Sequence, residues 1–340
     1  MQPIPVGVIG AGLWGTAQAG VFAEHPGVEL VAVCDLDASR TEALARAHGA
    51  RPYTDVERMF AAEALGAVGI ATPDHAHRDV VIAAAEAGTA ILVEKPLATT
   101  LQDAEAIAAV VRARGVRLMV DFHSRYSPPF NVAKGAIERG ELGRLVSAYY
   151  RLNDTIEVPL RMLSWAAQSS VLWFLGSHAV DTLRWFTGSE VVRVYAREIR
   201  TVLAGLGHDM ADGYQSLLEF ESGVVASVEN TWIVPRSHAN INDIKVNLLG
   251  SEGMLDLDLT NHGVVRRFTA ERMDYPDVFV LPKVHGRSVG FAHVSIWDFC
   301  DRLISGAPFV VGLEDGVAVT KTVCAMLESS RVGQPVEVAV

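Results

Sequence analysis

Short apolar runs alternate with longer segments of helical periodicity over the first third of this 340-residue chain. Residues 5–15 predict a buried strand followed by a glycine turn, residues 28–37, 67–73 and 91–93 predict further strands, and residues 103–123 repeat the helix–strand unit. The intervening segments predict helices, with Ser39 as an N-cap and with Gly88 and Gly115 at helix ends. Strands that alternate with helices indicate a doubly wound parallel sheet with right-handed crossovers. The pattern therefore predicts an α/β fold with an N-terminal Rossmann domain over residues 1–122.

The pattern changes after Phe122. Apolar or alternating segments at residues 145–154, 191–200, 214–222, 224–234, 244–250 and 254–259 are separated by turn residues and predict strands. Residues 169–188, 294–306 and 316–333 predict helices that cover one face of these strands. Residues 123–340 are therefore expected to form an α+β domain with a large, mainly antiparallel open sheet. A second copy of the chain is expected to cover the open face, as a homodimer or homotetramer.

Composition limits the classes of partner. Half of the residues (50%) are hydrophobic and 20% are charged, which suits two domains with large cores. A net charge of −11 and a pI near 5.5 disfavour nucleic acid and anionic membranes as partners. No apolar run reaches the length of a membrane span, and we expect a cytoplasmic protein. Cys34, Cys300 and Cys324 lack metal-ligand spacing and are expected to be reduced core thiols.

A glycine motif lies between the first strand and the first helix. Gly10 permits a tight turn, Gly12 lets the backbone approach a pyrophosphate, and Gly15 allows close helix packing. Asp35 follows at the end of the second strand, where a carboxylate accepts a hydrogen bond from a ribose 2′-hydroxyl. The same carboxylate repels a 2′-phosphate, so the sequence favours NAD over NADP. Arg40 is the feature that argues for NADP.

The stretch ILVEKPLATT places a lysine just beyond a buried strand. Residues 91–93 form the strand, and Pro96 ends it by fixing φ and removing a backbone donor. Ligands of open α/β sheets bind beyond the carboxyl ends of the strands, so Lys95 is a candidate ligand-binding residue. On this stretch alone, a solvated lysine at the exit of the strand is an equal alternative.

Several motifs together resemble the GFO/IDH/MocA oxidoreductases, the relatives of glucose-fructose oxidoreductase and inositol dehydrogenase. They are the glycine motif with Asp35, A-T-P-x-x-x-H at residues 71–77, E-K-P at 94–96 and G-S-H-x-x-D at 176–181. The resemblance implies that a nicotinamide ring lies over the E-K-P segment and that Lys95 binds the reacting oxygen. It also implies that His178 exchanges a proton with that oxygen, and that the peptide bond before Pro96 is often cis.

The resemblance also implies the wider site. The expected cofactor-binding residues, besides those of the glycine motif and Asp35, are Leu13, Trp14, Thr72, Pro73, His75, His77, Glu94, Lys95 and His123. The expected substrate-binding residues are Arg125, Asn153, Asp154, Trp165 and Asp181. Trp165 could stack on a sugar ring or belong to the core, and Asp181 could share the face of His178 or have a structural role. His75 and His77 lack a third ligand nearby, so no metal site is expected.

One position departs from the family. Many inositol dehydrogenase-like members have an aspartate four residues before the histidine, where this chain has Phe174. We expect an NAD(H)-dependent oxidoreductase acting on a secondary alcohol or ketone of a sugar, sugar derivative or cyclitol, with a dihydrodiol as a further substrate type. An NAD-dependent glycosidase of the same fold and a non-catalytic sugar or cofactor sensor are the alternatives.

Overall fold

The computed structural model describes residues 2–260, 264–271 and 273–339, and the chain divides into two compact units. Unit 1 comprises the residues up to Tyr126 together with Val278–Val317, and unit 2 comprises Ser127–Asp277 and Ala318–Val340. The predicted division at residues 122 and 123 did not include this return of the chain to unit 1. The chain returns to unit 1 because Ile296, Phe299 and Cys300 are buried in the same hydrophobic core as Phe22.

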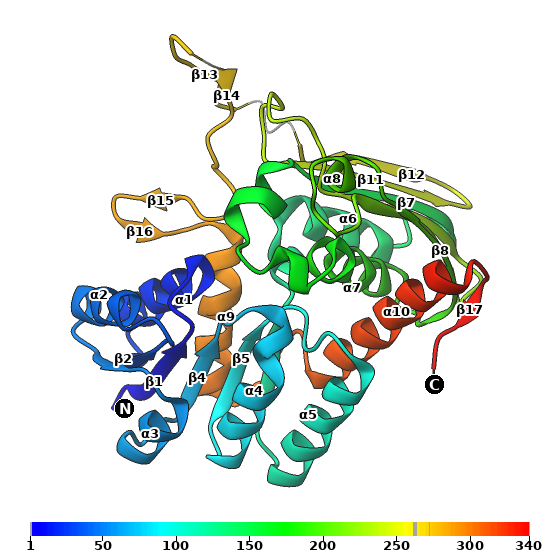
Figure 1. Ribbon diagram of the computed structural model, residues 1–340. Helices are drawn as coiled ribbons and strands as arrows, with labels where there is room; N and C mark the ends of the chain where they lie inside the picture. Colours follow the sequence, from blue (N-terminus) through cyan, green and yellow to red (C-terminus); the bar gives the residue numbers. More distant parts are fainter. Residues whose placement is uncertain (1, 261–263, 272, 340) are drawn as a thin grey trace. The chain divides into compact units, whose positions relative to one another are not determined.

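A six-stranded parallel sheet is the centre of unit 1 (Figure 1). Its order, β3-β2-β1-β4-β5-β6, reverses direction at β1 and β4, which confirms the predicted doubly wound sheet. The strands are β1 (Ile4–Ile9), β2 (Val28–Cys34), β3 (Arg51–Tyr53), β4 (Ala67–Ile70), β5 (Ala90–Glu94) and β6 (Leu118–Asp121). Strands β4, β5 and β6 are buried along their whole length, as expected for a sheet with helices on both faces.

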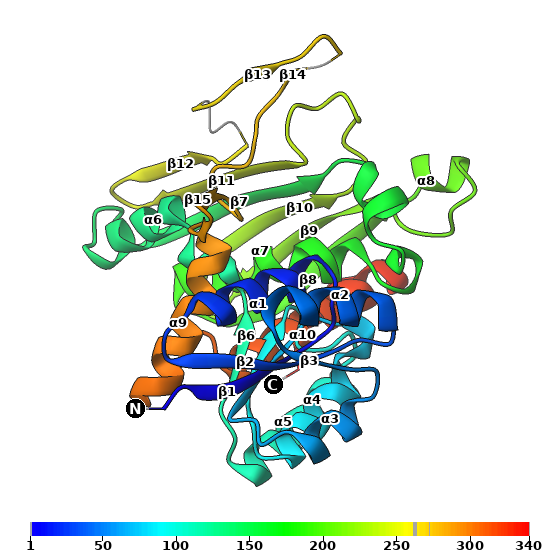
Figure 2. The same cartoon turned by 90° about the vertical axis from the view of Figure 1, so that its left-hand side faces the viewer.

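Helices cover both faces of this sheet (Figure 2). They are α1 (Leu13–Glu24), α2 (Ala38–His48), α3 (Val56–Ala62), α4 (His77–Glu86), α5 (Leu101–Arg114) and α9 (Phe291–Ser305). Helices α1 and α2 lie on one face, and α3, α4 and α5 lie on the other. Helix α9 packs beside α1, where the rings of Phe22 and Phe299 have centroids 6.4 Å apart.

The predicted cap of α2 is wrong. Asp37, and not Ser39, is the N-cap, because its carboxylate accepts hydrogen bonds from the backbone N–H groups of Ser39 and Arg40. The predicted helix ends hold, with Gly88 and Gly115 at positive φ just beyond α4 and α5. Of the cysteines, Cys34 and Cys300 are buried and Cys324 is half-buried, and all three are free thiols.

Unit 2 is built on a seven-stranded sheet of order β12-β11-β7-β10-β9-β8-β17. Only the neighbours β7 and β10 run parallel, so the prediction of a mainly antiparallel sheet is confirmed. The strands are β7 (Leu145–Asp154), β8 (Val191–Ile199), β9 (Gly213–Phe220), β10 (Val225–Thr231), β11 (Asn242–Gly250), β12 (Met254–Asp258) and β17 (Val336–Glu337). The short pairs β13 (Arg267–Phe268) with β14 (Met273–Asp274), and β15 (Lys283–Val284) with β16 (Arg287–Ser288), lie outside both large sheets.

Helices pack on one face of the second sheet. They are α6 (Pro128–Glu138), α7 (Ser177–Thr187) and α10 (Leu313–Val332), the last of which begins in the part of the chain assigned to unit 1, while α8 (Val202–Gly205) is a single turn that follows β8. Phe130 of α6 contacts Tyr150 of β7 and Phe186 of α7 edge-on. The residues that alternate with Tyr150 along the strand point to the opposite face of the sheet. No helix in the described parts of the chain is long and apolar enough to cross a membrane.

Candidate functional site

The glycine loop, residues 10–15, joins β1 to α1 at the carboxyl edge of the first sheet. Gly10 has a φ of 98°, and a Cβ on it would lie 2.4 Å from the carbonyl oxygen of Ala71. A Cβ on Gly15 would meet the carbonyl oxygen of Gly10 at 1.7 Å. Gly12, in contrast, has no atom within 4 Å of the Cβ position, so the backbone there borders open space. The loop therefore needs glycine for its own geometry at two positions and leaves room for a ligand at the third.

Asp35 is tied to this loop. Its carboxylate accepts a hydrogen bond of 2.6 Å from the backbone N–H of Ala11 and one of 2.9 Å from that of Asp37. Leu36 beside it is 95% exposed and Leu13 of the loop is 62% exposed, so apolar side chains flank the carboxylate. The Arg40 guanidinium lies 3.4 Å from the Asp37 carboxylate, which offers it a countercharge.

A second loop, Ala71–His77, follows β4. The buried hydroxyl of Thr72 has no hydrogen-bond partner within the described residues. The His77 ring lies between two backbone carbonyls, with Nδ1 2.7 Å from the oxygen of Pro96 and Nε2 3.1 Å from that of Thr72. Burial lowers the pKa of His77, and a neutral ring donates its one N–H to one of these carbonyls and only contacts the other. His77 thereby joins this loop to the E-K-P turn, while His75 is partly exposed beside Asp74.

The E-K-P turn, residues 94–96, follows β5 directly. Lys95 is only 8% exposed, and its peptide bond to Pro96 is cis. The sequence alternative of a freely solvated lysine is therefore wrong, because the side chain lies inside the protein. The Lys95 ammonium is buried at the carboxyl end of a parallel strand, where ligands of such sheets bind, so it can contact a bound ligand.

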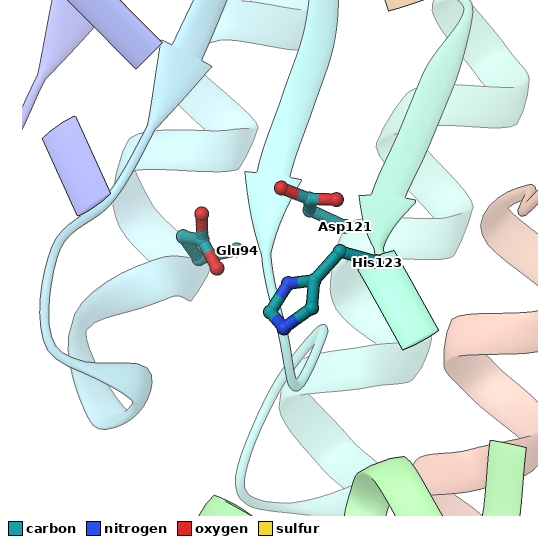
Figure 3. A group of neighbouring side chains, drawn as sticks. All are labelled: Glu94, Asp121 and His123. Carbon is teal, nitrogen blue, oxygen red and sulfur yellow. The ribbon is translucent and has the colours of Figure 1, made fainter. Parts of the chain in front are cut away.

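Three buried side chains gather beside this turn (Figure 3). One ligating atom from each of Glu94, Asp121 and His123 lies within 4.8 Å of the others, a spacing that a cation could use. Burial, and then the charge of Lys95, lower the pKa of His123 to about 3, so its ring is a neutral imidazole. Trp14 of the glycine loop stacks on this ring with centroids 4.8 Å apart.

Arg125 is held within unit 1. Its guanidinium lies 2.9 Å from the carboxylate of Asp315 and donates to the carbonyl oxygen of Val310. The arginine predicted to bind substrate is thus 9% exposed and already engaged by a carboxylate.

Helix α7 carries His178 and Asp181 in unit 2. The segment before it, Leu172–Gly176, is a π-helical turn, whereas the sequence predicted one continuous α-helix. Phe174 lies in that turn, and its ring meets Trp165 edge-on with centroids 6.3 Å apart. His178 is 8% exposed and Asp181 is fully buried. Trp165 thus has an aromatic neighbour and is not isolated on the surface.

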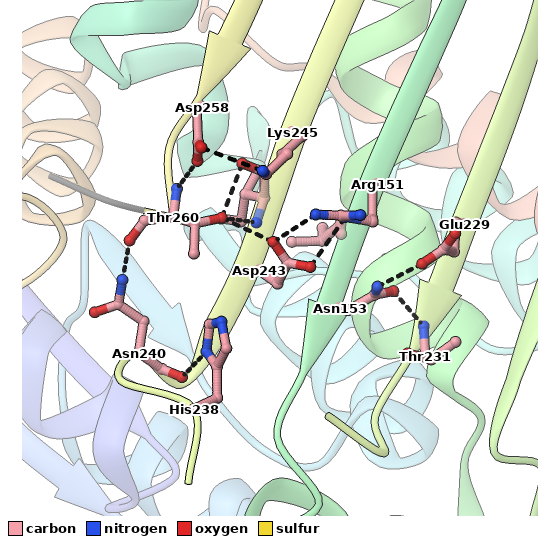
Figure 4. A network of polar contacts seen from close by, with 12 residues as sticks. Arg151, Asn153, Glu229, Thr231, His238, Asn240, Asp243, Lys245, Asp258 and Thr260 are labelled. Atoms are coloured by element: carbon pink, nitrogen blue, oxygen red, sulfur yellow. Dashed lines mark hydrogen bonds and ion pairs between the residues drawn. The ribbon is translucent and has the colours of Figure 1, made fainter. Parts of the chain in front are cut away.

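The predicted neighbours Asn153 and Asp154 point away from each other. Asn153 donates to Glu229 and accepts from the backbone N–H of Thr231, within a polar network on the second sheet (Figure 4). Asp154 instead accepts from Asn242. Because successive residues of a strand face opposite sides of the sheet, the two side chains cannot both line one pocket. The expectation that both face the substrate is therefore corrected.

The sequence reasoning missed Asp121, Ser295 and Gln18. Ser295 Oγ lies 2.6 Å from Asp121, and Gln18 donates to Glu94. The available signal was the aspartate at the end of the β6 run, because neighbouring parallel strands place their last residues side by side. The residues of the glycine loop fit a dinucleotide, on the evidence of the open space at Gly12 and the unpaired hydroxyl of Thr72.

Comparisons with known proteins agree with this geometry. Residues 4–122 match the oxidoreductase family with an NAD-binding Rossmann fold, and residues 130–256 match the GFO/IDH/MocA C-terminal domain. The chain is 30% identical to D-apiose dehydrogenase of Paraburkholderia graminis, over 97% of this chain and 88% of that protein. It is 29% identical to inositol 2-dehydrogenase 1 of Saccharopolyspora erythraea, over 98% and 96% of the two chains.

A solved structure gives the same result. GenD2 from gentamicin A biosynthesis, in complex with NAD, superimposes with a TM-score of 0.86 at 27% identity, over 100% of this chain and 97% of that one. The chain therefore belongs to the GFO/IDH/MocA family of oxidoreductases.

Proposed function

We propose that this member of the GFO/IDH/MocA family is an NAD(H)-dependent dehydrogenase for a secondary alcohol of a sugar, sugar derivative or cyclitol. The observation that carries the proposal is the buried Lys95 at the carboxyl end of β5, beside a glycine loop whose second glycine borders open space. The relatives named as dehydrogenases of D-apiose and inositol support the substrate class.

The glycine loop, Asp35 and the Ala71–His77 loop would hold the dinucleotide. When bound, its nicotinamide ring supplies the hydride acceptor. The Lys95 ammonium would donate a hydrogen bond to the substrate oxygen and stabilise negative charge as it develops there. Oxidation removes a hydride from carbon and a proton from oxygen, and the imidazole of His178 would accept that proton. Asp35 in place of a basic residue supports NAD as the cofactor.

The same proposal includes three further parts. The remaining loop residues bind the cofactor, the second unit binds the substrate, and the protein is cytoplasmic. The proposal also includes assembly into a homodimer or homotetramer through the second sheet. The open face of that sheet carries exposed apolar side chains, Leu217, Val225, Leu249 and Met254, among charged ones. A mixed surface of this kind is typical of interfaces between subunits.

A dehydrogenase screen tests the function. Inositols, aldoses, anhydrosugars and glycosides are each supplied with NAD⁺ or NADP⁺, and NADH formation is followed by absorbance. We expect NAD⁺-dependent oxidation of at least one polyol. Tightly retained cofactor with glycoside cleavage and no net NADH would instead indicate the glycosidase, and sugar binding without turnover would indicate the sensor.

Variants at Lys95 and His178 test the mechanism. Lys95→Ala should lower kcat about 10²- to 10³-fold, the usual effect of losing one donor to a developing oxyanion. His178→Ala should lower it about 10²- to 10⁴-fold by removing the proton acceptor. Both variants should keep their cofactor affinity within a few fold, measured by fluorescence titration. Near-normal kcat in Lys95→Ala would remove Lys95 from the chemistry.

A further inference from the structure

Two carboxyl groups face each other beneath the E-K-P turn. Glu94 ends β5 and Asp121 ends β6, and the two are register partners on neighbouring parallel strands. Their side chains therefore leave the same face of the sheet, as Figure 3 shows, and an oxygen of one lies within 4.8 Å of an oxygen of the other. Glu94 is 4% exposed and Asp121 is fully buried. We call these two residues the acid pair.

Each member of the acid pair has a side-chain hydrogen-bond partner at one oxygen. Gln18 donates to Glu94 Oε1 at 3.1 Å, and Ser295 Oγ lies 2.6 Å from Asp121 Oδ1. The other oxygens, Glu94 Oε2 and Asp121 Oδ2, are buried and have no hydrogen-bond partner in the described parts of the chain. An ionised carboxylate with an unsatisfied oxygen is costly in such a place, whereas a neutral carboxyl costs much less.

The contacts of Ser295 indicate which carboxyl is neutral. Its Oγ lies 2.6 Å from Asp121 Oδ1 and 2.9 Å from the carbonyl oxygen of Ala292, yet a hydroxyl has a single hydrogen. If Asp121 is ionised, one of these two contacts lacks a proton. If Asp121 is protonated, its O–H donates to Ser295 and the Ser295 hydroxyl donates to Ala292. The protonated form therefore satisfies every contact of the serine.

The charges around the acid pair indicate that the pair retains one proton. Lys95 interacts with Glu94, Asp121 and His123, and His123 is neutral. Other charged groups on the packed elements already have partners. Arg125 pairs with Asp315, and Asp298 accepts hydrogen bonds from both Tyr126 and Arg302. The titratable residues His77 on α4 and His293 on α9 are buried as well. One carboxylate balances Lys95, and two would leave a net negative charge in the interior.

Burial, and for Glu94 also the proximity of Asp121, raise the pKa of both carboxyls. The pKa of Glu94 is well above its usual range, and that of Asp121 is raised to about 7. Two interacting carboxyls titrate as a unit, so the first proton is lost much more easily than the second.

We propose that Asp121 is a positioning residue for Lys95: the acid pair retains one proton at neutral pH, which leaves Glu94 as the ionised member of the pair opposite the Lys95 ammonium. The role of Lys95 rests on the proposed function, but the proton itself is a property of the free protein.

Infrared spectroscopy of the free protein tests the proton directly. At neutral pH the unmodified protein should show the carbonyl absorption of a buried protonated carboxyl. Asp121→Asn should lose that absorption because Glu94 is then the one carboxyl left in the pair and ionises opposite Lys95. Glu94→Gln should lose it too, since Asp121 must then ionise. Absence of the absorption from the unmodified protein, or its survival in both variants, would overturn the proposal.

Thermal unfolding against pH is the second test. An acid whose pKa is raised in the folded state stabilises the fold through its bound proton, and this stability is lost as the pH rises from the unfolded pKa to the folded pKa. For Asp121 this window runs from about 4, the usual pKa of aspartate, to about 7. Asparagine mimics the protonated acid, because it is neutral and its amide can donate to Ser295. The Tm of Asp121→Asn should therefore match the unmodified protein at about pH 5 and exceed it by a few degrees at about pH 8.

Asp212 offers a matched control. It is also fully buried, but its carboxylate accepts hydrogen bonds from the backbone N–H groups of Thr201, Val202 and Leu203, which lower its pKa. Asp212→Asn should lower the Tm by a similar amount at both pH values and should keep the infrared absorption. A Tm difference for Asp121→Asn that does not change with pH would contradict the proposal.

Kinetics separate positioning from stability. The pH profile of kcat/KM should contain an ionisation of the acid pair near neutrality, and Asp121→Asn should lack that ionisation. An unchanged profile in Asp121→Asn would reject the positioning role. If the protein oxidises no polyol, the proposed function fails, but the infrared and Tm results still decide whether the proton is there.

Discussion

The carboxylate of Asp35 has two tasks at the edge of the glycine loop. It accepts a hydrogen bond from the N–H of Ala11, which fixes the loop, and it lies at the position that recognises a ribose hydroxyl in dinucleotide folds. The nearby cation Arg40 contacts Asp37, so the structure favours NAD more clearly than the sequence, where Arg40 was an argument for NADP.

Replacing Asp35 should therefore change cofactor choice. We expect Asp35→Ala and Asp35→Asn to reduce the preference for NAD⁺ over NADP⁺ about 10- to 100-fold, because a hydrogen bond to a charged group contributes about 1.5–3 kcal/mol and the repulsion of a 2′-phosphate disappears. Fluorescence titration with both cofactors measures the ratio. Asp79→Ala, which removes an exposed carboxylate on α4, is the control and should leave it unchanged. Tighter binding of NADP⁺ to the unmodified protein would contradict the assignment.

For Phe174 we predict an effect on a different property, the selectivity for substrate. Its ring contacts Trp165 edge-on and contributes apolar surface where inositol dehydrogenase-like relatives often have an aspartate. Phe174→Asp should lower kcat/KM for the best substrate of the screen by at least about tenfold, since an ionised group would replace apolar contacts. Phe174→Leu is the control and should retain most of the activity. Higher kcat/KM in Phe174→Asp would show that the ring is not part of the selectivity.

At the scale of elements, periodicity predicted most of the structure. The short apolar run of β5 and the alternating pattern of β9 and β10 each predict a strand from the sequence pattern, so these elements could be found without tertiary information. The π-helical turn before α7 could not be predicted, because its residues have the same apolar pattern as an α-helix.

The features that were missed depend on a local competition in one case and on distant residues in the others. Asp37 displaced Ser39 as a cap through a local competition between two good capping residues. Asp121 meets Glu94 only because β5 and β6 are neighbours in register, and Ser295 reaches Asp121 from α9, 174 residues away in the sequence. The sequence could not assign helix α9 to unit 1, because the amphipathic pattern of a helix does not indicate which of two cores its apolar face packs against.

At the scale of the whole molecule, the open face of the second sheet is the surface that carries the proposed assembly. Leu217 of β9 is 38% exposed and Val225 of β10 is 38% exposed, and their strands are paired in register. Charged pairs such as Arg193 with Glu219 lie among them. The structure shows a face of mixed apolar and charged side chains, which a single chain tolerates and which a second copy can cover.

Leu217→Asp tests this assembly. The substitution places a charge where the proposed interface buries a leucine, and the lost burial alone is about 1.5–3 kcal/mol for each copy, so the dissociation constant should rise at least about tenfold. Light scattering coupled to size-exclusion chromatography over a dilution series measures the change. Val132→Asp replaces a valine that is 69% exposed on α6 and is the matched control, which should keep the mass of the unmodified protein. An unmodified protein that is monomeric at every concentration would contradict the assembly. If the unmodified protein is a dimer or tetramer and Leu217→Asp has the same mass as it and as Val132→Asp, the interface lies elsewhere.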